Sequence, residues 1–337
     1  MDLTRRQVLL VTLSGGLVAA CAGRTDVPPS ASAPASAGTG VPPTTPVPAT
    51  SPSAARPSAT AAAPALPAAR PWMARAGEVQ PSVKERATSL IEAVGSWTGG
   101  AGDLTHARAR AEAAGHPASL VDALAPLLGP EPSAVTVVRD AQYGGILSSS
   151  ASVLVVADQW RARSDGHVTP GGKTLDVRLV AAIPRWRVVE VLPARPGRAA
   201  AALSRAARNV LSDNRIRLPY AARSDVLSGN VHDSVLGLLA AMAREHVVDV
   251  SVIRSGHPLY VFGTSRTSDH PRGRAVDVWA LDERPLVLPS NHSLAASAMR
   301  YAVAHGAYNV GGPVLLAGPA YFTNRTHQDH IHLGLPG

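Results

Sequence analysis

The chain of 337 residues has little of several residue types, and each shortage excludes something. Its single cysteine, Cys21, rules out both an internal disulfide bond and a cysteine-based zinc site. Phe, Trp and Tyr together make up only 4%, so Ala, Val and Leu must build the cores. No run of Lys and Arg is interleaved with aromatic residues, so we expect no nucleic-acid partner. The net charge of +8 fits an anionic cell envelope instead.

The first 21 residues have the layout of an export signal. Arg5 and Arg6 precede an apolar stretch, residues 8–20, that is too short to cross a bilayer as a helix. The sequence VAAC at residues 18–21 resembles a bacterial lipobox, which implies a lipid anchor on Cys21 and a place on the extracytoplasmic face of the cell membrane. Around the two arginines the sequence resembles a twin-arginine signal, and general secretion stays an alternative. A signal cut elsewhere, with Cys21 discarded, is the other possibility.

Composition then divides the rest of the chain. Residues 22–72 are rich in Pro, Ala and Ser with little charge, and such a segment cannot bury enough apolar surface to fold, so we expect a disordered linker that acts as a stalk. Two folded domains should follow, an accessory domain over residues 73–195 and a second one over residues 196–337. For both we expect an α+β fold in which helices pack on an antiparallel sheet.

Apolar spacing in residues 73–195 predicts two helices followed by four strands. The helices are expected at residues 83–94 and 118–128, and the strands at residues 134–140, 152–159, 174–182 and 186–192. This order, and the strand RWRVVEVLP, resembles the nuclear-transport-factor-two-like cone. No catalytic constellation is evident here, so we expect an accessory or ligand-binding role.

The second domain should contain three helices and four strands. The helices are expected at residues 196–212, 231–246 and 294–305, and the strands at residues 248–253, 260–262, 274–281 and 330–335. Seven of the twelve histidines lie between His257 and His332, within this domain.

Two histidine patterns in this domain suggest a metal site. His270 lies in a turn before an expected strand that carries Asp277, so both side chains could reach one point. A third ligand must come from elsewhere, and His330 and His332 alternate on the closing strand, so they face the same side. Catalytic zinc typically takes three such ligands and keeps one position for water. One of the two strand histidines could therefore bind metal while the other faces water or substrate.

These patterns resemble those of zinc peptidases that share a fold with D-alanyl-D-alanine peptidases, lysostaphin-like endopeptidases and the hedgehog amino-terminal domain. The motif S-x-H-x-x-G-x-A-x-D is complete in residues 268–277, and the ending HQDHIH at residues 327–332 is similar to that of murein endopeptidases. The resemblance covers about residues 200–337. It implies that His270, Asp277 and His332 hold Zn²⁺.

The general base has three candidates. The resemblance favours Asp329, three residues before the last ligand, whereas a regular strand would turn Asp329 away from His332 and favour His330. His327 is a third candidate, for holding the water or the transition-state oxyanion. The candidate substrate-binding residues are Arg254, Ser268 and Arg272.

Together these features predict a zinc-dependent metallopeptidase, a carboxypeptidase or endopeptidase, that acts on the peptide stems of peptidoglycan in the cell wall. The substrate rests on the resemblance and on the expected location. One alternative is a non-catalytic zinc-containing envelope lipoprotein with a binding or signalling role. Another is an accessory protein that binds a ligand through residues 73–195.

Overall fold

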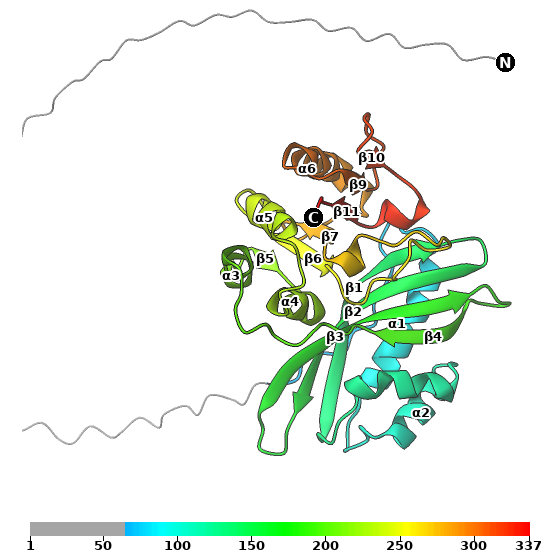
Figure 1. Cartoon of the computed structure of the whole chain (residues 1–337). Coiled ribbons are helices and arrows are strands. Elements are labelled where there is room, and N and C mark those ends of the chain that lie inside the picture. The colour runs from blue at the N-terminus through cyan, green and yellow to red at the C-terminus, as the bar shows by residue number, and fades with distance from the viewer. Residues whose placement is uncertain (1–64) are drawn as a thin grey trace, which may run out of the picture. The chain divides into compact units, whose positions relative to one another are not determined.

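Two sheets with helices packed against them make up residues 65–337, the part of the chain that this computed structural model describes (Figure 1). The predicted α+β class, with antiparallel sheets, is thereby confirmed. By their contacts both sheets belong to one unit, Thr60–Gly337. The predicted export signal, Cys21 and most of the predicted linker lie outside the described residues.

The first sheet has four antiparallel strands in the order β1-β2-β3-β4. They are β1 (Ser133–Ile146), β2 (Ser150–Ala162), β3 (Val168–Val180) and β4 (Arg187–Pro193). Helices α1 (Pro81–Gly95) and α2 (Leu104–Ala113) and a 3₁₀ segment (Ala118–Leu127) accompany it. Each strand is near its predicted place. The second predicted helix is a 3₁₀ segment instead, with Pro126 near its end.

One apolar core joins this sheet to its helices. Helix α1 contributes a stripe of buried side chains that includes Val83, Leu90 and Val94, and these pack on β1, β2 and β3. Trp72, the last residue of the predicted linker, is only 8% exposed and belongs to the same core. The ordered fold therefore begins slightly before residue 73.

The second sheet has the strand order β10-β9-β11-β7-β6-β5, with β8 paired to β7. The strands are β5 (Ile216–Arg217), β6 (Val248–Val252), β7 (Ala275–Leu281), β8 (Arg284–Pro285), β9 (Asn309–Gly311), β10 (Tyr321–Phe322) and β11 (Ile331–Gly334). Its helices are α3 (Arg205–Ser212), α4 (Tyr220–Leu227), α5 (Asp233–Met242) and α6 (His292–Ala304). The central pairs are antiparallel, whereas the outer pairs β5–β6 and β9–β10 are parallel.

Two predictions for this second domain were wrong: the start of one helix and the presence of one strand. The helix predicted from residue 196 starts only at Arg205, where the hydroxyl of Ser204 accepts a hydrogen bond from the Ala207 N–H and caps it. The strand predicted at residues 260–262 is a loop that holds one isolated bridge, between Tyr260 and Thr267. Within residues 65–337 no helix is long and apolar enough to cross a membrane.

The two sheets have separate apolar cores but meet through buried polar groups. Strand β1 contacts the 3₁₀ segment Arg325–Gln328, just before β11. There the Tyr143 N–H donates to Asp329 Oδ2, and the Gln142 amide donates to Asp277 Oδ2. The first sheet therefore lies directly against the residues for which chemistry is predicted.

Candidate metal centre

Two of the predicted ligands come from neighbouring central strands. Asp277 lies on β7 and His332 on β11, and the two residues are direct partners in the antiparallel register. Directly opposed residues project their side chains from the same face of the sheet. The pairing therefore brings the Asp277 carboxylate beside the His332 ring, with 3.0 Å between Oδ1 and Nδ1.

The third predicted ligand reaches this point from a tight turn. His270 begins a 3₁₀ turn (His270–Arg272) that ends at Gly273, whose φ of 69° is in the left-handed region. A Cβ on Gly273 would lie 2.1 Å from the carbonyl oxygen of Asn230, so a side chain cannot fit there. The glycine of the motif thus lets the chain turn back over the sheet, with the His270 ring fully buried.

A backbone carbonyl fixes the orientation of the His270 ring. Its Nδ1 donates to the carbonyl oxygen of Ile253 over 2.6 Å, so the neutral ring carries its proton on Nδ1. The Nε2 lone pair is then free, and it lies 3.1 Å from Asp277 Oδ1 and 3.1 Å from His332 Nδ1. Such a second hydrogen bond is usual for a metal-binding histidine.

Three donor atoms therefore form a triangle with sides of 3.0–3.1 Å. In a tetrahedral zinc site with bonds of about 2.0–2.1 Å, neighbouring ligand atoms are about 3.3–3.4 Å apart. When both rings are neutral, His270 Nε2 carries no proton, and at most His332 Nδ1 does. At least two of the three buried atoms therefore point unshared electron pairs at each other. A cation at the centre would satisfy all three. The donor set fits a metal ion.

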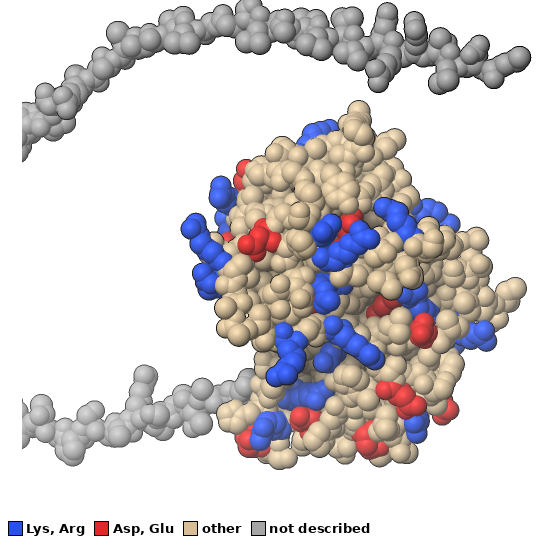
Figure 2. All heavy atoms as spheres, viewed as in Figure 1, with Lys and Arg blue, Asp and Glu red and all other residues tan. Residues whose placement is uncertain are grey.

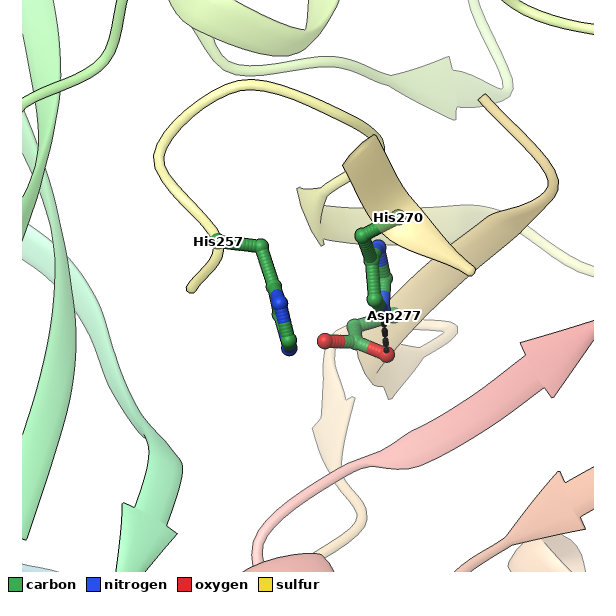
Figure 3. A group of neighbouring side chains, drawn as sticks. All are labelled: His257, His270 and Asp277. Carbon is green, nitrogen blue, oxygen red and sulfur yellow. Dashed lines mark hydrogen bonds and ion pairs between the residues drawn. The ribbon is translucent and has the colours of Figure 1, made fainter. Parts of the chain in front are cut away.

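His257 adds a fourth imidazole, one whose role the sequence left open. Its ring stacks on that of His270 with 4.1 Å between the centroids, and its Nδ1 donates to the Pro258 carbonyl oxygen. Figure 3 shows both rings beside the Asp277 carboxylate. Ligand atoms of His257, His270 and Asp277 lie within 4.8 Å of one another, so this cluster too could hold a metal ion. The shorter distances favour His332 as third ligand and leave His257 at the edge.

Burial and nearby charges favour the metal-binding forms of Asp277, His332 and His257. Burial raises the pKa of Asp277, but His270 and His330 outweigh it and hold that pKa well below its usual value. Burial lowers the pKa of His332, and burial with the nearby His270 lowers that of His257. A deprotonated carboxylate and neutral imidazoles are the forms that bind cations.

A cavity of about 660 Å³ opens onto this cluster. His327, His330 and His332 line it, together with Tyr143 of β1 from the first sheet and Phe322 of β10. His327 Nδ1 donates to Asn324 Oδ1 over 2.8 Å, which leaves its Nε2 as an acceptor. Burial lowers the pKa of His327 well below its usual value, so the ring stays neutral.

Of the candidate bases, His330 lines the cavity and Asp329 does not. The His330 Nδ1 lies 2.5 Å from Asp329 Oδ1, while its Nε2 lies 3.7 Å from Asp277 Oδ2. Asp329 lies just outside β11 and turns its other oxygen toward the Tyr143 N–H and the Lys84 ammonium. The carboxylate therefore orients His330, and His330 is the group at the cavity.

The charge on Asp329 is held by a buried lysine. Lys84 is fully buried on α1 and its ammonium lies 2.5 Å from Asp329 Oδ2. Although burial raises the pKa of Asp329, Lys84 and His330 outweigh it and lower that pKa to about 2. Asp329 and Asp277 in turn raise the pKa of His330 above its usual value, against the effect of burial.

The candidate substrate-binding residues lie in three different places. Ser268 is buried and lines the main cavity, where its hydroxyl accepts a weak hydrogen bond from the His270 N–H. Arg254 lines a second cavity of about 510 Å³, and His257 lines both cavities. Arg272 is exposed at the end of the turn and is not among the residues that line either cavity.

Comparisons with protein-family models, with curated proteins and with solved structures found no match for this chain. The motif resemblance at residues 268–277 and 327–332 therefore rests on the sequence alone. The geometry of the cluster is the main support for a function.

Proposed function

We propose that this chain is a zinc-dependent metallopeptidase that cleaves peptides of the cell wall. The observation that supports it most is the triangle of His270 Nε2, Asp277 Oδ1 and His332 Nδ1, beside a cavity that His332 lines. Two imidazoles and one carboxylate are a ligand set typical of catalytic zinc, because they leave one position open for water. The cavity provides room for a substrate at that position.

His330 is the proposed general base. Zinc would polarise the scissile carbonyl and lower the pKa of a bound water toward about 7. His330 Nε2, held toward Asp277 and the cavity by the bond between Nδ1 and Asp329, would take the proton of the attacking water. The same Nε2 would then deliver that proton to the leaving amine. Asp329 keeps the ring in one orientation and stabilises its protonated form.

His327 is proposed to hold the water rather than the oxyanion. Its Nε2 is an acceptor because Nδ1 donates to Asn324, and an acceptor can receive a hydrogen bond from water but cannot give one to an oxyanion. The edge contact between its ring and Phe322, with centroids 4.7 Å apart, limits its rotation.

The choice of cell-wall peptides rests on three features. The closing HxxHxH pattern resembles that of murein endopeptidases, and the first residues resemble a lipoprotein export signal. The surface also fits an anionic polymer, since Lys and Arg side chains cover more of the face in Figure 2 than Asp and Glu do. The net charge of +8 agrees with this.

Metal content and cleavage test the proposal together. The purified protein should contain about one zinc per chain, and incubation with isolated peptidoglycan should release new amino groups that disappear on chelation and return with zinc. His330→Ala should keep the metal and lower the rate by roughly 10²–10⁴-fold. The matched control is His167→Ala, which removes an exposed histidine from the turn between β2 and β3 and should leave the rate unchanged.

Two outcomes would contradict the proposal in different ways. A protein that folds but binds no zinc would refute the metal site. One zinc per chain without metal-dependent cleavage of peptidoglycan or of its stem peptides would refute the peptidase and favour the non-catalytic envelope protein.

A further inference from the structure

We propose that Gln142, on the first sheet, is a positioning residue of the metal centre, so that residues 73–195 are part of the site and not an appendage to it. The inference rests on the proposed metal site but does not require that the protein be a peptidase. It comes from one buried chain of hydrogen bonds between the two sheets, Asp277–Gln142–Ser251.

The two carboxylate oxygens of Asp277 have different partners. Oδ1 faces His270 and His332, whereas Oδ2 accepts a hydrogen bond of 2.6 Å from the Gln142 amide. His330 Nε2 lies 3.7 Å from Oδ2, beyond hydrogen-bond distance. Gln142 thus decides which oxygen turns to the metal position.

Gln142 itself is held in one orientation. The residue is fully buried, and the hydroxyl of Ser251 on β6 donates to its Oε1. An amide flipped by 180° would place Oε1 against the carboxylate of Asp277, and two acceptors would then face each other. The amide therefore presents its NH₂ group to Asp277, and Ser251 fixes it there.

A purely structural tie between the sheets would predict something different from a positioning role. If Gln142 only joins the sheets, its loss lowers stability and leaves the affinity of the folded protein for metal unchanged. If Gln142 orients the ligand, its loss leaves Oδ2 without a donor in a buried place and frees the carboxylate to rotate. Outer partners of metal ligands typically contribute 10–100-fold to affinity.

The test compares two buried glutamines of the same sheet in the full chain. Gln142→Met keeps the length of the side chain and removes the donor, and its affinity for Zn²⁺, measured by competition with a chromophoric chelator, should fall 10–100-fold. The visible spectrum of the Co²⁺-loaded protein should change as well. Gln159→Met is the control, because Gln159 is buried on β2 but donates to the carbonyl oxygens of Gly95 and Leu127, away from the site. Its affinity and spectrum should equal those of the wild type.

A milder variant covers the case in which Gln142→Met does not fold. Ser251→Ala removes the hydroxyl that fixes the amide and that also lies 3.3 Å from the Asp277 carbonyl oxygen, and affinity should fall a few-fold. Wild-type affinity in both Gln142→Met and Ser251→Ala overturns the inference, and if Gln142→Met does not fold, wild-type affinity in Ser251→Ala alone overturns it. A wild-type chain that binds neither Zn²⁺ nor Co²⁺ refutes the proposed metal site itself, which is a separate result.

Discussion

Replacing Lys84 by methionine should destabilise the protein more than the same replacement at Arg86, the other buried cation of α1. The ammonium of Lys84 is fully buried between the carboxylates of Glu78 and Asp329. Methionine has nearly the same length and shape, so packing changes little and the charge is what is removed. Asp329 would then be a buried carboxylate without its cation.

The loss in the free energy of unfolding depends on whether each carboxylate can take up a proton once Lys84 is gone. Burial already raises the pKa of Glu78 to about 7, against the opposite effect of Lys84, so Glu78 can take up a proton at little cost. Asp329 cannot do so as easily, because its bonds to His330 and the Tyr143 N–H require the charged form. Removing one partner of a buried ion pair typically costs about 3–5 kcal/mol. That is a large share of the roughly 5–15 kcal/mol by which domains are stable.

Urea denaturation at pH 7, on the metal-free protein, measures the loss. Arg86→Met is the matched control on the same helix, since Arg86 is a buried cation that bonds only to carbonyl oxygens, those of Ala114 and Gly115, and should cost about 1–3 kcal/mol. Glu78→Gln in the Lys84→Met background should add little, because Glu78 would already be neutral. A loss for Lys84→Met below about 1 kcal/mol, or no greater than that for Arg86→Met, would refute this reasoning.

Three further predictions test other features. Gly273→Ala should lower the free energy of unfolding by at least about 2 kcal/mol, because its Cβ would meet the Asn230 carbonyl oxygen and its φ is left-handed. The control is Gly237→Ala, in open space on α5, which should be neutral or slightly stabilising in the same thermal melts. Burial lowers the pKa of His116 from 6.5 to about 4, so the unfolded chain binds a proton before the folded one as the pH falls. This residue should therefore lower the free energy of unfolding by about 2 kcal/mol between pH 6.5 and 4. His116→Phe should reduce this pH dependence in urea denaturation, and an unchanged pH dependence would contradict the assignment. Asp277→Asn removes the anionic ligand and should abolish stoichiometric zinc by elemental analysis, and a variant that still holds one zinc would exclude Asp277 as a ligand.

Local periodicity predicted the three central strands of the second sheet, β6, β7 and β11, and the helices α5 and α6. Strand β7 was predicted from the continuous apolar run around Val276 and Val278, and α6 from apolar spacing. Short elements such as β5 and β9 were not predicted, because two or three residues have no period of their own and are strands only through their pairing partners. Helix α2 was missed as well, since it is polar on most sides and buries only Ala107 and Ala111.

The structure brings the three predicted ligand residues together, but whether they bind metal stays a prediction. Asp277 and His332 are opposite each other on β7 and β11, which sequence could suggest only through the resemblance. Partners from the first sheet were not predicted, because no pattern relates Gln142 to a residue so far along the chain. Lys84 did leave a signal. It follows Val83 in the apolar stripe of α1, and a lysine on that buried face needs an anionic partner.

The hydrogen bonds that surround the metal position join residues very distant along the chain. Gln142 and Asp277 are 135 residues apart, and Tyr143 and Asp329 are 186 apart. Contacts of such separation form late, after most of the chain has been ordered. The affinity for metal should therefore rise only at the last step of folding, and an ion that binds only the finished fold stabilises it by mass action. Metal uptake at low metal concentration would then report that the two sheets have met, and a chain with only the second sheet formed would bind its ion more weakly.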